Sequence, residues 1–162
     1  MIKLELLDKI VEDFEKSPAQ FDKVLEKVEA DNLALFDMLL GSHAEILNDD
    51  EMDYLVFLFV IIYEAFSTAY NLSKVEEDSI ERMDESTWEI INEYNDFEKC
   101  YDHIEKDFIE KELLEFIYVS IDKDEEKDYD ITESGRLVML SVLITESKLL
   151  CQISSAIDRA AI

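Results

Sequence analysis

The sequence predicts an all-α protein, a single-domain helical bundle of about six to seven helices that spans residues 1–162. Only two glycines and one proline occur in the chain, which leaves little material for the tight turns of β-hairpins. Hydrophobic residues make up 48% of the chain, so there is ample material for a core. Apolar side chains recur at three- and four-residue spacing along most of the sequence, and this is the period of an amphipathic helix.

The N-terminal part predicts two amphipathic helices followed by shorter segments. Residues 2–16 place apolar side chains four residues apart and carry Glu–Lys pairs at i,i+4 on the other side. Ser17 and Pro18 then have the residue types of an N-cap and a first helical position. We expect Asp31 to cap a further segment that ends at Gly41, and residues 42–47 to form a short helix or turn.

Residues 54–72 are apolar on every side for their first ten positions, which is typical of a central buried helix or of a membrane span. The uninterrupted apolar run is about half of the roughly 20 residues that a span requires. Glu64 lies within the segment, and acidic residues rather than Lys or Arg precede it. We therefore expect a central helix from about 52 to 71 and no membrane insertion.

The second half of the chain predicts two more amphipathic segments and another central helix. Residues 75–95 have one apolar face opposite a largely acidic face, and residues 97–121 repeat the helical period with a phase shift that indicates a bend. Thr132 has the residue type of an N-cap, and few charges follow Gly135. A helix from about 133 to 160 is therefore expected to be the second central element.

The negative charge of the chain is concentrated in its middle. The whole chain carries a formal charge of −26, and residues 76–133 hold 23 acidic against six basic residues, a net of −17. Because the apolar faces of these segments must be buried, their carboxylates should share an outer surface, about 5–6 Å apart along a helix. The predicted partner-binding residues are Glu77, Glu81, Asp84, Glu85, Glu89, Asp102, Glu105 and Glu112.

This charge repels nucleic acid and anionic membranes, so the expected partner is a basic protein. We expect a non-catalytic protein that acts as an immunity protein, an inhibitor or a nucleic-acid mimic, with no direct nucleic-acid binding. The formation of a homodimer is a further possibility. A simpler interpretation is that the acidic surface is a solvated face that keeps the protein soluble. The two cysteines have no CxxC spacing, which favours a reducing compartment. Charges interrupt the apolar residues of the N-terminus, unlike in a signal peptide, so we expect a cytoplasmic location.

Residues 122–133, DKDEEKDYDITE, support a calcium-responsive helix–loop–helix module as an alternative function. Acidic residues occupy positions 1, 3, 5, 7, 9 and 12 of the stretch, which are the ligand positions of an EF-hand loop. Position 6, where the sharp turn of that loop requires glycine, holds Lys127, and no second loop is present. A solvated connector is therefore favoured. The candidate calcium ligands are Asp122, Asp124, Glu126, Asp128, Asp130 and Glu133.

A carboxylate-metal helical-bundle enzyme is the remaining alternative. Glu64 and Glu146 lie in the two apolar segments and could meet in the interior as a raised-pKa pair or as metal ligands. His43 and His103 are the only histidines, and neither belongs to an HExxH or ExxH arrangement. The sequence also lacks a glycine-rich phosphate loop and a GxSxG motif. We expect no catalytic residue, no cofactor and no enzymatic activity.

Overall fold

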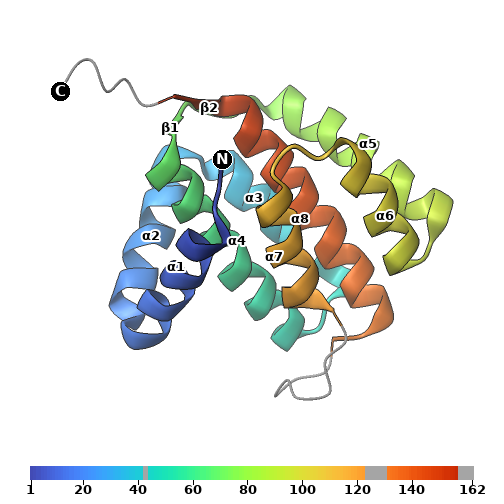
Figure 1. Cartoon of the computed structure of the whole chain (residues 1–162), viewed down its shortest axis with the longest axis horizontal. Helices are drawn as coiled ribbons and strands as arrows, with labels where there is room; N and C mark the ends of the chain where they lie inside the picture. Colours follow the sequence, from blue (N-terminus) through green and yellow to red (C-terminus); the bar gives the residue numbers. More distant parts are fainter. Residues whose placement is uncertain (42–43, 123–130, 157–162) are drawn as a thin grey trace.

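The computed structural model describes residues 1–41, 44–122 and 131–156 (Figure 1). These residues form α-helices, one short 3-10 helix and two strands of two residues each, so the predicted all-α fold is confirmed. In chain order the elements are α1 (Leu4–Lys16), α2 (Pro18–Asp31), α3 (Leu33–Gly41), η1 (Ala44–Ile46), α4 (Asp49–Ala69), β1 (Asn71–Leu72), α5 (Glu77–Tyr94), α6 (Phe97–Asp107), α7 (Lys111–Ile121), α8 (Glu133–Ile153) and β2 (Ser154–Ser155).

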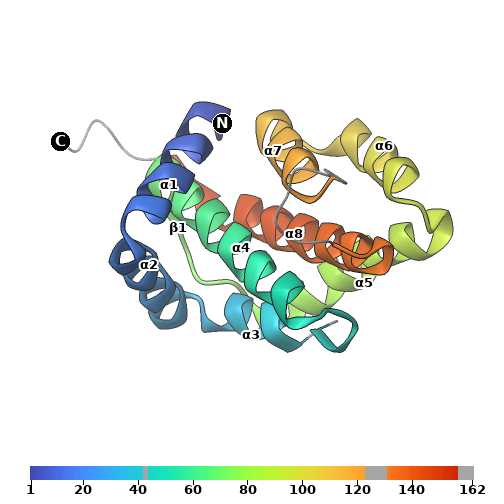
Figure 2. The same ribbon diagram turned by 90° about the horizontal axis from the view of Figure 1, so that it is seen from below.

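Helices α4 and α8 pack against each other in the middle of the molecule, as the sequence predicts (Figure 2). Helix α4 also contacts α1 and α2, whereas α8 also contacts α5, α6 and α7. Figure 2 shows the resulting layers, with α1 and α2 beside α4 and with α5, α6 and α7 around α8. Both central helices bury side chains on most of their circumference, because amphipathic helices cover them on several sides.

The second central helix is shorter than predicted. Helix α8 ends at Ile153, and the next two residues leave the helix to pair antiparallel with Asn71 and Leu72 of β1. The backbone N–H of Ser73 also donates to the carbonyl of Ile153 at 3.0 Å. Residues 157–160 of the predicted helix lie outside the described residues. Helical periodicity could not reveal this ending, because the strand pairing depends on a segment about 80 residues away in the sequence.

The predicted bend within residues 97–121 is a complete break between two helices. Helix α6 ends at Asp107 and α7 begins at Lys111, with Phe108 buried in the core between them. The phase shift in the apolar pattern marks this break, since the two halves bury different faces. Helix α6 packs on α5 and α8, whereas α7 packs on α8 and α1.

One buried carboxylate joins the N-termini of the two central helices. Asn48 and Glu51 form a capping box at the start of α4, in which the Asn48 side chain accepts from the Glu51 N–H at 2.8 Å and Glu51 Oε1 accepts from the Asn48 N–H at 3.0 Å. The other oxygen, Glu51 Oε2, accepts from the N–H and hydroxyl of Thr132 at 2.9 and 3.0 Å. Thr132 in turn caps α8 by accepting from the N–H of Gly135, which confirms the predicted cap.

Among the described residues, α4 alone is long and apolar enough to cross a membrane by length and composition. The core helix of a soluble protein passes the same test, so this finding is weak evidence for a span. The position of α4 between α1, α2 and α8 fits the predicted core helix.

Candidate functional site

The first members of the predicted acidic row line a groove between α3 and α5. Glu77 and Glu81 are exposed on α5, and Asp84 is half-buried one turn further along the same face. The groove has a volume of about 360 Å³. Its lining consists of Ala34, Asp37, Met38 and Gly41 from α3, and Glu77, Ile80, Glu81 and Asp84 from α5.

The lining of this groove combines an apolar bottom with an acidic rim. Met38 is buried and Ile80 is half-buried, so their side chains form the bottom of the groove together with Ala34. Four carboxylates surround this strip, and none of the described residues that line the groove is basic. Lys74 lines an adjoining pocket together with Asp37 and Glu77. Such a groove offers both apolar area and negative potential, which are the two features that an amphipathic cationic segment needs.

Asp37 is the groove residue that the sequence-based prediction missed. The prediction followed rows of several acids on one helix, whereas Asp37 is the single charged residue of α3, LALFDMLLG. The available signal was a lone carboxylate on a short apolar helix, four residues before the glycine that ends it. It could not be assigned to the row, because the contact between α3 and α5 is a tertiary one.

The other predicted residues lie outside the groove. Glu85 and Glu89 are exposed further along α5, and Asp102 and Glu105 are exposed on α6. They contribute to the negative surface, but none of them lines the groove that contains Ile80 and Met38. We therefore separate the groove carboxylates from the rest of the predicted surface.

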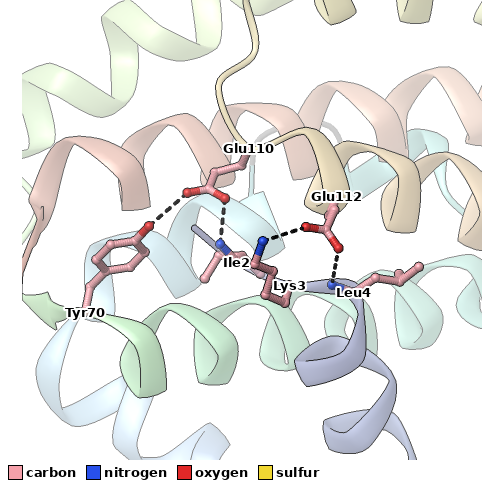
Figure 3. Close-up of polar contacts among 6 residues, drawn as sticks. All are labelled: Ile2, Lys3, Leu4, Tyr70, Glu110 and Glu112. Carbon is pink, nitrogen blue, oxygen red and sulfur yellow. Dashed lines mark hydrogen bonds and ion pairs between the residues drawn. The ribbon is translucent and has the colours of Figure 1, made fainter.

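Glu112 has an intramolecular role at the start of the chain (Figure 3). Its Oε1 atom accepts from the backbone N–H of Leu4 at 3.2 Å, and its Oε2 atom lies 3.4 Å from the Lys3 ammonium. The hydrogen bond from Leu4 lowers the pKa of Glu112, and the charge of Lys3 acts in the same direction. Because its carboxylate is already used within the chain, we leave Glu112 out of the proposed surface.

Glu110, next to Glu112 in Figure 3, holds the same N-terminal segment from a buried position. Its Oε2 atom accepts from the backbone N–H of Ile2 at 2.7 Å, and its Oε1 atom accepts from the Tyr70 hydroxyl at 3.0 Å. Burial, followed by this hydrogen bond and the charge of Glu110, raises the pKa of Tyr70 to about 12. These contacts fix the first residues against α4 and α7.

Behind the groove, Asp84 is close to a fully buried carboxyl group on α8. Burial is the main cause that raises the pKa of Glu146 well above its ordinary value, and the charge of Asp84 adds to it. Neither carboxyl oxygen of Glu146 has a hydrogen-bond partner among the described residues. The buried hydroxyls of Ser141, Thr145 and Ser147, on the same helix, also lack one there.

Glu64 and Glu146 have different charged neighbours, and neither carboxyl group contributes to the pKa shift of the other. Burial raises the pKa of Glu64, and the charge of Lys27 on α2 opposes this shift. The charge that acts on Glu146 is that of Asp84 on α5. The two glutamates belong to different sides of the core, because α2 packs on α4 and α5 packs on α8.

The described residues include only the two ends of the predicted calcium loop. Asp122 Oδ1 accepts from the Arg136 guanidinium at 3.0 Å, which occupies one oxygen of the first candidate ligand. Glu133 is exposed as the first residue of α8. Asp124, Glu126, Asp128 and Asp130 lie outside the described residues, so calcium binding by this loop stays a prediction.

Within the parts of the chain that the structure describes, no three His, Cys, Asp or Glu residues are placed to hold a metal ion together. His103 Nδ1 lies 3.1 Å from the Tyr94 hydroxyl and the two rings are in contact, whereas His43 lies outside the described residues. No protein-family model, curated protein or solved structure matches the chain. The case for a function therefore depends on the charge and geometry of the chain itself.

Proposed function

We propose that this chain is a non-catalytic interaction protein whose groove between α3 and α5 binds a basic segment of a partner protein. One observation carries the proposal: the carboxylates of Asp37, Glu77, Glu81 and Asp84 surround an apolar strip, and the described part of the lining contains no basic residue. A cationic amphipathic segment would bury its apolar side chains on Met38 and Ile80 and place its Lys or Arg side chains against the rim.

The net charge of the chain supports a cationic partner. A formal charge of −26 on 162 residues creates self-repulsion that reduces the stability of the folded state. A bound cationic segment relieves part of this repulsion, and the negative field accelerates the encounter. The affinity should fall steeply with added salt, because charges separated by more than about 10 Å are screened at 0.1 M ionic strength.

An inhibitor or immunity protein differs from a nucleic-acid mimic in the residues that it needs. The first two need a local groove that fits one segment of a basic enzyme or toxin. A mimic needs a long row of regularly spaced charges, which would include Glu85 and Glu89 beyond the groove. Charge reversal at the two parts of α5 therefore distinguishes these possibilities.

The test compares two double variants that change the net charge by the same amount on the same helix. The first is Glu77→Lys with Glu81→Lys in the groove, and the second is Glu85→Lys with Glu89→Lys outside it. A synthetic Lys/Leu amphipathic helical peptide without tryptophan serves as the probe. Trp88, the single tryptophan of the chain, lies one turn beyond Asp84 on α5 and reports binding by fluorescence.

We expect the groove variant to weaken binding of the peptide by about tenfold or more, equivalent to about 1.4 kcal/mol, and the other variant to weaken it much less. A peptide of equal charge without apolar residues should bind the wild-type protein more weakly, since it cannot use the apolar strip. Equal losses in the two variants would exclude the groove and favour the extended row of a mimic. Circular dichroism of each variant verifies that the helices are intact.

A further inference from the structure

A second cavity, of about 560 Å³, lies where the C-terminal part of α2 meets the end of α4 and the segment that follows it. Its lining is mainly polar and includes Lys27, Asn32, Tyr63, Ser67 and Lys74. Strand β1 forms part of the wall, and its pairing with β2 fixes that wall to the end of α8. None of the carboxylates that line the α3–α5 groove belongs to this cavity.

A buried asparagine leaves the hydroxyl proton of Tyr63 available to a ligand. Asn32 is 2% exposed, and its Oδ1 atom accepts from the backbone N–H of Val75 at 2.9 Å. A backbone N–H can only donate, so this bond fixes the orientation of the amide. Asn32 Nδ2 therefore donates to the Tyr63 oxygen at 3.1 Å, and the Tyr63 O–H must find a different acceptor. The described residues provide none, and the hydroxyl belongs to a residue of the cavity wall.

Lys27, Ser67 and Lys74 add further donors to the wall. The Lys27 ammonium donates to the Ser67 hydroxyl oxygen, which leaves the Ser67 proton and two ammonium protons for further bonds. Lys74 adds a second ammonium group, and it also lines a neighbouring pocket together with Asp37 and Glu77. A cavity with several donors and two positive charges is complementary to a ligand that carries acceptor oxygens and negative charge.

The described lining of this cavity holds more basic than acidic side chains, in contrast to the chain as a whole. Two of the 15 basic residues line it, against one carboxylate among the described lining residues, that of Asp31, which is exposed. The carboxylate of Glu64, which does not line the cavity, interacts electrostatically with the Lys27 ammonium. In a chain with 41 acidic residues, a pair of lysines around one cavity is a local concentration of positive charge, although the charges of Asp31 and Glu64 also act on Tyr63 there.

We propose that this cavity binds a small organic oxyanion, a carboxylate or phosphate about the size of a sugar phosphate. Lys27 and Lys74 would pair with the oxyanion, and Tyr63 and Ser67 would donate hydrogen bonds to it. The volume lies within the roughly 300–1,000 Å³ of small-molecule sites and leaves room for a polar body beside the charged group. This site is additional to the groove, and it could exist whether or not the groove binds a basic partner.

The test measures thermal stability with glucose 6-phosphate, gluconate, inorganic phosphate and neutral glucose as separate probes. Any salt stabilises a chain of charge −26 by screening, so sodium chloride keeps the ionic strength equal in all samples. At about one hundred times its dissociation constant, a ligand should raise Tm by roughly 5–10 °C. A rise with glucose 6-phosphate alone identifies a phosphate site, a rise with gluconate alone identifies a carboxylate site, and a rise with both identifies the shared oxyanion chemistry.

Matched variants connect the effect to the cavity. The double variant Lys27→Met with Lys74→Met should abolish the rise in Tm, whereas Lys99→Met on the exposed face of α6 should retain it. In the wild-type protein, the NMR signal of the buried Asn32 amide should shift with the probe that raises Tm, which is a readout independent of how the variants fold. No rise beyond that of sodium chloride, an equal rise with glucose, or an undiminished rise in the double lysine variant would overturn the proposal.

Discussion

Asp84 of α5 and Glu146 of α8 interact across the interface of their helices, and the charge of Asp84 adds to burial in raising the pKa of Glu146. Asp84 also lines the proposed partner groove, so a buried acid lies behind one wall of that groove. The neutral form of a fully buried carboxyl group is favoured, because its charged form loses hydration without gaining hydrogen bonds. The stability of the fold should therefore depend on the proton at Glu146.

The variant Glu146→Gln should reduce the loss of stability as pH rises. The pKa of Glu146 is raised in the folded state above its ordinary value of 4.5, so the folded chain holds this proton more tightly than the unfolded chain. The resulting stabilisation is fully present below the ordinary pKa and is lost as pH rises through the raised one, with a slope of up to about 1.4 kcal/mol per pH unit. Glutamine has no such proton, so urea unfolding at several pH values should show a flatter profile.

Glu85→Gln is the control for this profile, because it removes one exposed carboxylate from α5 and reduces the general repulsion equally. Its stability should follow the wild-type pH dependence within about 0.5 kcal/mol. If the free energy of unfolding changes with pH equally in the Glu146 variant and the control between pH 4.5 and 8, the proton on Glu146 is not the source of the pH dependence.

The two glycines of the chain should respond differently to replacement by alanine. A Cβ atom at Gly135 would lie 1.8 Å from Glu51 Oε2 and 2.8 Å from Thr132 Oγ1, whereas a Cβ atom at Gly41 would meet no atom within 4 Å. The Glu51 carboxylate cannot move away without loss, since it accepts hydrogen bonds from Asn48 and Thr132. Gly135→Ala should therefore destabilise the fold by about 1–3 kcal/mol, as measured by chemical denaturation.

Gly41→Ala should leave stability unchanged or increase it by up to about 1 kcal/mol, because alanine restricts the unfolded chain and favours the helix. The cause of the Gly135 effect can be isolated with Glu51→Ala, which removes the clashing carboxylate. The double variant Glu51→Ala with Gly135→Ala should be less destabilised than the sum of the single variants. Strict additivity would mean that the clash is not the cause.

The fold was largely predictable because its strongest signals are local. The continuous apolar character of residues 54–63 and the scarcity of charge after Gly135 both require burial on all sides, and α4 and α8 meet this requirement by packing together. The Thr132 cap was also visible, as a hydroxyl residue in front of an apolar segment. The capping box of α4 was harder to predict, because Glu51 is one of several acidic residues in a cluster. Its hydrogen bonds to Thr132 could not be predicted from local sequence, since the two residues are 81 positions apart.

The candidate site was predictable only in part, because some of its contacts join helices that are distant in the sequence. Helical spacing placed Glu77, Glu81 and Asp84 on one face. It could not show that α3 lies beside this face and supplies Asp37, nor that Glu112 is occupied by the chain's own N-terminal segment. Periodicity assigns a side chain to a face of its helix, whereas the neighbour of that face is determined by tertiary packing.

Glu110→Ala should release the N-terminal segment. The variant leaves the buried N–H of Ile2 without its acceptor and removes the partner of the Tyr70 hydroxyl, with an expected loss of about 2–4 kcal/mol. Hydrogen exchange at the Ile2 amide should accelerate strongly. The matched variant Glu112→Ala removes a partly exposed acceptor of Leu4 and should cost about 1 kcal/mol or less. Similar exchange rates at Ile2 in both variants would contradict the role of Glu110.

Arg136→Lys should destabilise the start of α8 although it keeps the charge. The guanidinium of Arg136 donates from Nε to the Ile121 carbonyl at 3.1 Å and from Nη2 to Asp122 at 3.0 Å, and it stacks 4.2 Å from the centre of the Phe97 ring. A lysine ammonium is a point charge that cannot make both hydrogen bonds and stack at once. We expect a loss of about 2–3 kcal/mol in denaturant unfolding.

Arg82→Lys provides the control, because Arg82 is exposed on α5 and makes one bond of 3.3 Å, from Nε to the carbonyl of Asp78. Its effect should stay within about 0.5 kcal/mol. The comparison separates the stability lost with the specific contacts of the buried guanidinium from the general effect of replacing an arginine by lysine. If both variants lose the same small amount, the Arg136 contacts add nothing beyond their charge, and the attachment of α7 to the first turn of α8 must come from apolar packing alone.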